Sequence, residues 1–102
     1  MASSWDEEQY ANARLIAAVG REMKMSSRDI LIAIMAAMQE SSLRNLNGGD
    51  RDSRGLFQQR PSQGWGTVQQ VTDPIYASRK FFSALKSAVS YTHLTLPTNR
   101  EV

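Results

Sequence analysis

The sequence predicts a mainly α fold: one small helical domain with a buried central helix and a glycine-rich loop or short hairpin. The 102 residues are 41% hydrophobic and 22% charged, which is ordinary for a single globular domain with one core. Three segments combine a helix start signal with helical spacing of apolar residues. Between the second and the third lies a stretch rich in glycine and small polar residues, which breaks regular structure.

The first helix is predicted from about Ser4 to Met23. Ser4 and Glu7 have the spacing of a capping box, in which each side chain accepts a hydrogen bond from the other residue's backbone N–H. Apolar side chains then recur at helical spacing on one face, which is expected to pack against the rest of the domain. These side chains are Leu15, Ile16, Val19 and Met23.

The second helix has a start signal at Ser26 to Asp29, followed by an unbroken apolar run from Ile30 to Met38. A run that is apolar on every side predicts a central, buried helix rather than an amphipathic surface helix. The run ends at Gln39 and Glu40, so a carboxyl group closes the most apolar segment of the chain.

Residues 45–66 are predicted to form loops or a short hairpin, because glycine and polar residues dominate them. A short helix is predicted at 67–71. Asp73 and Pro74 form a good pair for the cap and first residue of a last helix. In that helix we expect an inward face and a solvated face. The inward face consists of Phe81, Phe82 and Leu85, and the solvated face consists of Arg79, Lys80 and Lys86.

Residues 1–89 are assigned to the domain and residues 90–102 to a tail. The run SYTHLTLPT in this tail resembles translated vector or adaptor sequence, so we expect a non-native or disordered tail without a functional role. The first ten residues lack the basic start and apolar run of a secretory signal. A role outside the cell would therefore need another segment to export the domain.

Composition excludes several classes of site. The absence of cysteine excludes disulfides and thiolate metal sites, and a single histidine leaves little room for a histidine-based triad, so we expect no metal and no cofactor. The net charge of +2 comes from scattered residues, which is compatible with an anionic polymer but gives no basis for a nucleic-acid partner. No segment approaches the roughly 18 apolar residues of a membrane span. We expect a monomeric domain.

Glu40 is the first candidate for chemistry. Desolvation at the end of a buried helix and the negative end of the helix dipole both favour the protonated carboxyl group. A carboxyl group that keeps its proton near neutral pH is suited to general acid catalysis. The alternative is a partly exposed glutamate that only ends the helix.

A wider pattern surrounds Glu40. The helix end Gln39-Glu40-Ser41 is followed by a polar, glycine-rich loop, by the segment Gly55-Leu56-Phe57-Gln58, and by Asp73-Pro74 before an aromatic-rich helix. Together these resemble the lytic transglycosylase and goose-type lysozyme superfamily, above all its compact actinobacterial and phage cell-wall members. The resemblance covers about residues 12–85. It implies a lysozyme-like α+β fold with a glycan cleft, and a location in the extracellular space, the cell wall or a phage virion.

The resemblance also implies roles for individual residues. Glu40 matches the catalytic acid and base, Gln58 the glutamine that faces the sugar, and Ser41 the serine that holds the helix end. Tyr76 lies where side chains often line the cleft. Two positions depart from the pattern: Gly48 to Asp50 replaces a region that often carries a serine, and Arg60 stands where goose-type lysozymes carry an aspartate.

Further residues of the loop suit a saccharide. Phe57 and Trp65 offer faces for stacking on sugars, although a domain of this size also needs aromatic residues in its core. Hydrogen bonds to hydroxyl and acetamido groups are expected from Ser53, Gln58 and Gln59. Arg60 is expected to meet carboxylates of the lactyl group or the stem peptide.

The resemblance implies cleavage of the MurNAc-GlcNAc β-1,4 bond of peptidoglycan glycan strands. Glycoside cleavage usually needs two carboxyl groups. Asp50 and Asp52 are candidates for the second, unless they only stabilise turns or pair with nearby arginines. Without a second carboxylate, Glu40 serves as acid and then as base, and a lytic transglycosylase forms 1,6-anhydro-muramyl ends. The alternatives are a hydrolytic muramidase using Asp50 or Asp52, a non-catalytic wall-binding or phage structural domain, and a helical interaction module.

Overall fold

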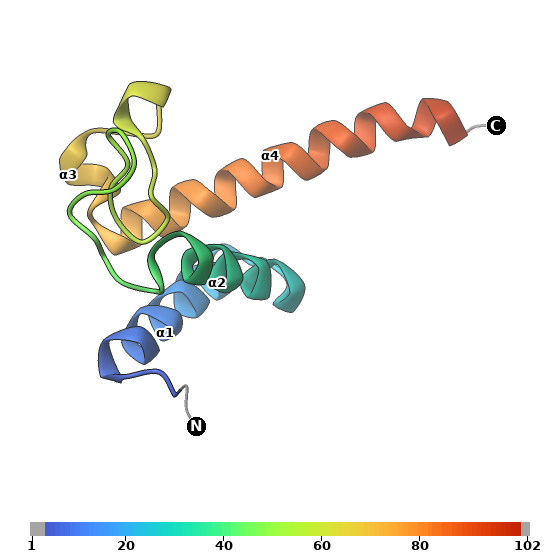
Figure 1. Ribbon diagram of the computed structural model, residues 1–102. Coiled ribbons are helices and arrows are strands. Elements are labelled where there is room, and N and C mark those ends of the chain that lie inside the picture. Colours follow the sequence, from blue (N-terminus) through green and yellow to red (C-terminus); the bar gives the residue numbers. More distant parts are fainter. Residues whose placement is uncertain (1–3, 101–102) are drawn as a thin grey trace.

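The computed structural model describes residues 4–100, with side chains described as far as residue 88. This part of the chain holds four α-helices and one 3₁₀ turn, and no strand (Figure 1). The elements are α1 (Glu7–Glu22), α2 (Ser27–Ser41), η1 (Pro61–Gln63), α3 (Val68–Val71) and α4 (Pro74–Arg100). The prediction of a mainly helical fold is confirmed. The predicted short hairpin is reduced to one isolated antiparallel bridge, between Arg54 and Gln59.

The core lies where α1, α2 and α4 meet, because each of these helices packs against the other two. Its fully buried side chains include Ile16 of α1 and Phe82 of α4, and burial of each stabilises the fold by about 1.5–3 kcal/mol. A Cβ on Gly20 would lie 2.5 Å from Cγ1 of Ile30 and 3.0 Å from the Phe82 ring. Gly20 therefore permits the close approach of the three helices.

The start of α1 differs from the prediction. The N-cap is Asp6 rather than Ser4, and the capping box joins Asp6 to Gln9: Gln9 N donates to Asp6 Oδ1 at 3.0 Å, and Asp6 N donates to Gln9 Oε1 at 2.9 Å. Asp6 also pairs with Arg44 at 2.8 Å, a contact that Ser4 has no charge to make. The predicted inward face is confirmed, with Ile16 and Val19 buried and the remaining two side chains half-buried against the core.

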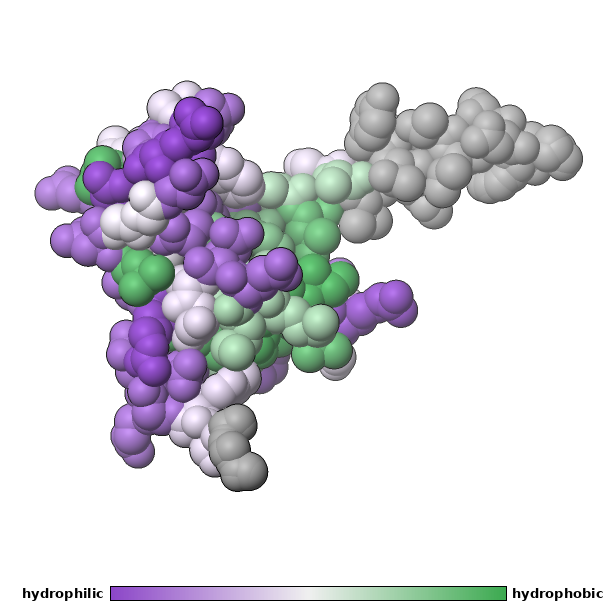
Figure 2. All heavy atoms as spheres, viewed as in Figure 1, coloured by the Kyte–Doolittle hydropathy of each residue, from purple (hydrophilic) through white to green (hydrophobic). Residues whose placement is uncertain are grey.

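The start of α2 agrees with the prediction, since Ser26 caps the helix in a capping box with Asp29. The predicted burial on every side is wrong. Leu31 is 55% exposed and Met35 is 60% exposed. The reason is that α1 and α4 cover one side of α2, and the rest of the described chain is too small to cover the other. Figure 2 shows hydrophobic surface open to solvent beside the base of α4.

Helices α3 and α4 begin where the sequence predicted them. Thr67 caps α3, and Asp73 Oδ1 accepts a hydrogen bond from Ile75 N at 3.0 Å at the start of α4. On α4, Phe82 is fully buried, whereas Lys80, predicted to face water, is half-buried. The remaining predicted orientations are consistent with the structure, as Phe81 and Leu85 are half-buried and Arg79 and Lys86 are exposed.

The described part of α4 reaches Arg100 and so includes residues 90–100 of the predicted tail. The assignment of 90–102 as a non-native or disordered tail stays a prediction, and residues 101–102 lie outside the described part of the chain. Across the described residues, no helix has the length and hydropathy needed to cross a membrane.

Candidate functional site

Helix α2 ends one residue after Glu40, in an unusual backbone path. Ser42 has φ 56° and ψ 38°, and Leu43 has φ 59°, so two consecutive residues other than glycine adopt the left-handed conformation. Each such residue costs about 1 kcal/mol or more. Backbone hydrogen bonds partly offset this cost: Ser42 N donates to Met38 O at 2.9 Å and Leu43 N to Ala37 O at 3.2 Å. The Leu43 side chain is also fully buried.

Ser41 connects the end of α2 to the loop that follows it. Its side chain is buried, and its hydroxyl lies 2.7 Å from Leu56 O and 3.0 Å from Ala37 O, so it donates to one of these carbonyls at a time. The same oxygen accepts a hydrogen bond from Arg44 N at 3.2 Å. Ser41 therefore fixes the segment Gly55–Gln58 against α2 and does not face the solvent.

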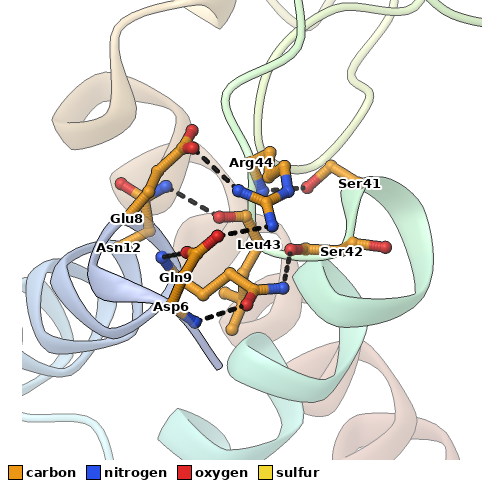
Figure 3. Close-up of polar contacts among 8 residues, drawn as sticks. All are labelled: Asp6, Glu8, Gln9, Asn12, Ser41, Ser42, Leu43 and Arg44. Carbon is orange, nitrogen blue, oxygen red and sulfur yellow. Dashed lines mark hydrogen bonds and ion pairs between the residues drawn. The ribbon is translucent and has the colours of Figure 1, made fainter. Parts of the chain in front are cut away.

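A set of polar contacts joins α1 to the residues after α2, and we call it the junction cluster (Figure 3). It consists of Asp6, Glu8, Gln9, Asn12, Ser41, Ser42, Leu43 and Arg44. Gln9 Nε2 donates to Ser42 O at 2.9 Å, and Asn12 Nδ2 donates to Leu43 O at 2.7 Å. The carbonyl groups of the two left-handed residues that follow α2 are thereby satisfied by side chains of α1.

The outer edge of the junction cluster is ionic. Arg44 Nη2 donates to Asp6 Oδ2 and Arg44 Nη1 to Glu8 Oε1, each at 2.8 Å. The hydrogen bond from Arg44, followed by the one from Gln9 N, holds the pKa of Asp6 below its ordinary value of 3.8. Roles for Gln9, Asn12 and Arg44 were not predicted from the sequence. A glutamine three residues after Asp6 was a local signal for the cap, but no local signal exists for contacts with residues 42–44.

A pocket of about 150 Å³ lies beside the end of α2. Its walls come from α2, the loop and α4, and they are Ala36, Glu40, Phe57, Gln58, Gln59, Trp65 and Phe81. Five of the residues predicted to act on a glycan are thus brought together, namely Glu40, Phe57, Gln58, Gln59 and Trp65. The volume equals that of about five water molecules in the liquid, so the pocket admits part of a ligand.

Glu40 itself is exposed, and the desolvation predicted for it is therefore absent in the free chain. The prediction failed because the face of α2 that carries it is open to solvent. Its carboxylate makes no hydrogen bond or ion pair with any residue from 4 to 88. Glu40 is therefore a carboxylate on the rim of a pocket, available to a ligand.

The aromatic residues of the pocket differ in accessibility. Phe57 is only 6% exposed and stacks on Phe81, with ring centroids 4.7 Å apart and planes 16° apart. It therefore belongs to the core as well as to the pocket wall. Trp65 is half-buried, and its carbonyl oxygen accepts a hydrogen bond from Tyr76 Oη at 3.1 Å. Tyr76 is absent from the pocket wall and instead holds the backbone that carries Trp65.

Gln58 and Gln59 are both held by their amide groups. Gln58 has φ 50°, and its Nε2 donates to Gly48 O at 3.1 Å and to Gly55 O at 3.3 Å. A Cβ on Gly49 would overlap the Gln58 amide, so the amide lies directly against the backbone of Gly49 and would have to shift to admit a larger residue. Gln59 is 3% exposed, and its Nε2 donates to Ala77 O at 3.1 Å, while its Oε1 is buried without a partner in the described chain.

The two candidates for a second carboxylate do not line the pocket. The Asp50 side chain is 93% exposed, and its carboxylate lies 4.0 Å from Arg51. Asp52 is fully engaged. Its Oδ1 accepts from Arg60 Nε at 2.7 Å and from Ser62 Oγ at 3.0 Å, and its Oδ2 accepts from Ser62 N at 2.8 Å. The Arg60 hydrogen bond, followed by that of Ser62 N, holds the pKa of Asp52 well below its usual range.

These contacts also place the remaining candidates. Arg60 is bound to Asp52 and connects the two sides of the loop. Ser53 is buried, and its N–H donates to Asp50 O at 3.1 Å, so it stabilises a turn and does not reach the pocket. Within the described residues, no group of three or more acidic, histidine or cysteine side chains is placed to hold a metal ion.

Comparisons of the chain with protein-family models, with curated proteins and with solved structures find no match. The resemblance in sequence motifs therefore has no independent counterpart in these comparisons.

Proposed function

We propose that the chain cleaves the MurNAc-GlcNAc β-1,4 bond of peptidoglycan as a lytic transglycosylase, with Glu40 as acid and then as base. One observation carries the proposal: Glu40, on the rim of the pocket, has no partner in the described chain, while the other walls are aromatic, aliphatic or amide groups. A carboxylate bound to arginine, such as Asp52, is held in its charged form. Glu40 carries no such restraint and can exchange a proton with a ligand.

The ligand supplies the desolvation that the free chain lacks. A sugar ring seated against Ala36, Phe57 and Phe81 would exclude water from the Glu40 carboxyl group. Exclusion of water disfavours the charged form and favours the protonated acid. The acid is then prepared when the substrate is bound, which agrees with an exposed Glu40 in the free chain.

The reaction needs one carboxyl group. The Glu40 proton passes to the glycosidic oxygen, the C1–O bond breaks, and its electron pair stays on the leaving oxygen. The acetamido oxygen of the same muramyl residue stabilises the positive charge at C1. The Glu40 carboxylate then takes the proton of the C6 hydroxyl, and the C6 oxygen bonds to C1. The 1,6-anhydro ring closes, no water is consumed, and Glu40 regains its proton.

The absence of a second acidic residue from the pocket wall favours this route over hydrolysis. An inverting hydrolase places its two carboxyl groups about 6.5–9.5 Å apart, with a water between them. Asp52 is engaged by Arg60 and Ser62, and Asp50 is directed to the solvent and to Arg51. Neither lines the pocket that Glu40 borders.

Two further residues of the pocket have groups suited to a saccharide. Trp65 is half-buried and offers its ring for stacking on a sugar face. Gln58 uses its Nε2 within the loop, and its Oε1 makes no hydrogen bond with residues 4–88, so it can accept one from an acetamido N–H or a hydroxyl group. The substrate places the site of action in the extracellular space, the cell wall or a phage virion.

The test is digestion of purified peptidoglycan by the 102-residue chain, with mass spectrometry of the released muropeptides. We expect products one water lighter than those of hydrolysis, and unchanged products from Asp50→Asn. Reducing-end products that disappear in Asp50→Asn would instead assign hydrolysis with Asp50 as the second carboxylate. Binding to the wall by the folded chain without any release would identify a non-catalytic wall-binding domain.

A further inference from the structure

The backbone that directly follows Glu40 and the end of α2 is supported from outside α2. Ser42 and Leu43 both have positive φ, of 56° and 59°, which disfavours this path for residues other than glycine. A more relaxed path would let the last turn of α2 extend or unwind. The direction in which the Glu40 side chain leaves the helix would then change with it.

Support comes from two amide side chains of α1. Gln9 Nε2 donates to Ser42 O at 2.9 Å, and Asn12 Nδ2 donates to Leu43 O at 2.7 Å (Figure 3). Gln9 is itself fixed, because it is 9% exposed and closes the capping box with Asp6. These donors hold the two left-handed carbonyl groups from a separate helix, more than thirty positions away in sequence.

Glu40 has no restraint of its own. Its carboxylate makes no hydrogen bond or ion pair within residues 4–88, so only the backbone fixes its place on the pocket rim. The path of residues 41–43 therefore decides where the acid lies relative to Phe57 and Trp65.

We infer that Gln9 and Asn12 are positioning residues that hold Glu40 in register with the pocket, an inference that rests on the proposed function. Neither touches the substrate. A displacement of about 1 Å at a reacting group can cost about a hundredfold in rate, so loss of either donor lowers kcat. The pocket walls formed by the loop and α4 remain, so KM changes little.

Two isosteric variants remove the donors. Asn12→Asp replaces the Nδ2 donor by an oxygen facing Leu43 O, and Gln9→Glu removes the Nε2 donor while keeping an acceptor for Asp6 N. If the charge added by Asn12→Asp prevents folding, Asn12→Ala takes its place, because alanine favours the helix and only deletes the donor. The matched control is Ala18→Gly, which weakens the exposed side of α1 without touching residues 42–44.

The experiment measures kcat and KM on soluble glycan strands, at a temperature where circular dichroism shows every variant folded. We expect kcat to fall about tenfold to a hundredfold in the donor variants, with KM retained and with Ala18→Gly close to the unmodified chain. Donor variants that keep their kcat while folded would overturn the inference and leave the proposed function intact.

A second readout decides the inference if the unmodified chain releases no product, an outcome that would defeat the proposed function by itself. NMR relaxation of the backbone amides of Glu40 to Leu43 reports the order of the segment that sets the place of the acid. Lower order in Asn12→Ala than in the unmodified chain, with Ala18→Gly unchanged, would still support positioning by α1. Equal order in all three chains would overturn it.

Discussion

Glu40 and residues 41–44 are neighbours in the chain, but their surroundings are opposite. Residues 41–44 are bonded to side chains at the start of α1, namely those of Asp6, Glu8, Gln9 and Asn12 (Figure 3), and the Ser41 hydroxyl reaches the loop at Leu56 O. Glu40, in contrast, has no hydrogen-bond or ion-pair partner in the described chain. The difference shows that hydrogen bonds fix the backbone after Glu40, whereas none of them restrains the Glu40 carboxyl group.

The same contrast separates Glu40 from Asp52. Asp52 accepts three hydrogen bonds and stabilises the loop, while Glu40 accepts none in the described chain. Substitution of bonded residues should therefore lower stability, and substitution of Glu40 should leave stability unchanged.

The largest loss of stability is expected at Leu43. Leu43→Ala deletes a fully buried side chain at the left-handed turn and should lower the free energy of unfolding by about 2–5 kcal/mol, measured by urea denaturation. The control Leu31→Ala, in the open face of α2, should change it by less than about 0.5 kcal/mol. Equal losses in the two variants would show that the turn after α2 is not part of the core.

An intermediate loss is expected at Ser41. Ser41→Ala leaves the buried carbonyl of Leu56 without its donor, which should cost about 1–3 kcal/mol of unfolding free energy. Ser27→Ala, at an exposed position near the start of the same helix, is the control and should be close to neutral. A neutral Ser41→Ala would mean that the loop holds its place beside α2 without this hydrogen bond.

A smaller and pH-dependent loss is expected at Asp52. Because the folded state lowers the pKa of Asp52 below its ordinary value of 3.8, the stability that Asp52 contributes is present above that value and is lost as the pH falls below it. Asp52→Asn should therefore lower the midpoint of urea denaturation at neutral pH. The gap between the midpoints of the variant and the unmodified chain should close as the pH falls. Asp50→Asn, at an exposed position, should show no gap at any pH. A gap for Asp52→Asn that stays constant with pH would contradict the ion pair with Arg60.

The sequence predicted the local features of the fold well. Ser26 and Asp73 each cap a helix as predicted, because a cap depends on residues three positions away or fewer. It was wrong about the start of α1, since Arg44, far along the chain, favours Asp6 as the cap over Ser4. Two neighbouring candidates for an N-cap can therefore be told apart from the local sequence only where no distant charged residue pairs with one of them.

Burial and the details of the site were less predictable for the same reason. The apolar run of α2 predicted burial on every side, but burial of Leu31 and Met35 depends on how much of the chain packs around α2. Glu40, Gln58 and Trp65 do meet at one pocket. The family resemblance implied this for Glu40 and Gln58, and Trp65 was expected to stack on a sugar. The pairing of Asp52 with Arg60 and the amide donors from α1 are contacts across the fold, and they could only be read from the structure.

The most direct measurement compares Glu40→Gln with Glu7→Gln in release of muropeptides and in thermal unfolding. Glu40→Gln should unfold at the same temperature as the unmodified chain and lose at least about a hundredfold in activity, because it keeps the shape of the side chain and removes the proton. Glu7→Gln, a change at an exposed glutamate away from the pocket, should keep full activity. A folded Glu40→Gln chain that releases product as fast as the unmodified chain would contradict a catalytic role for Glu40.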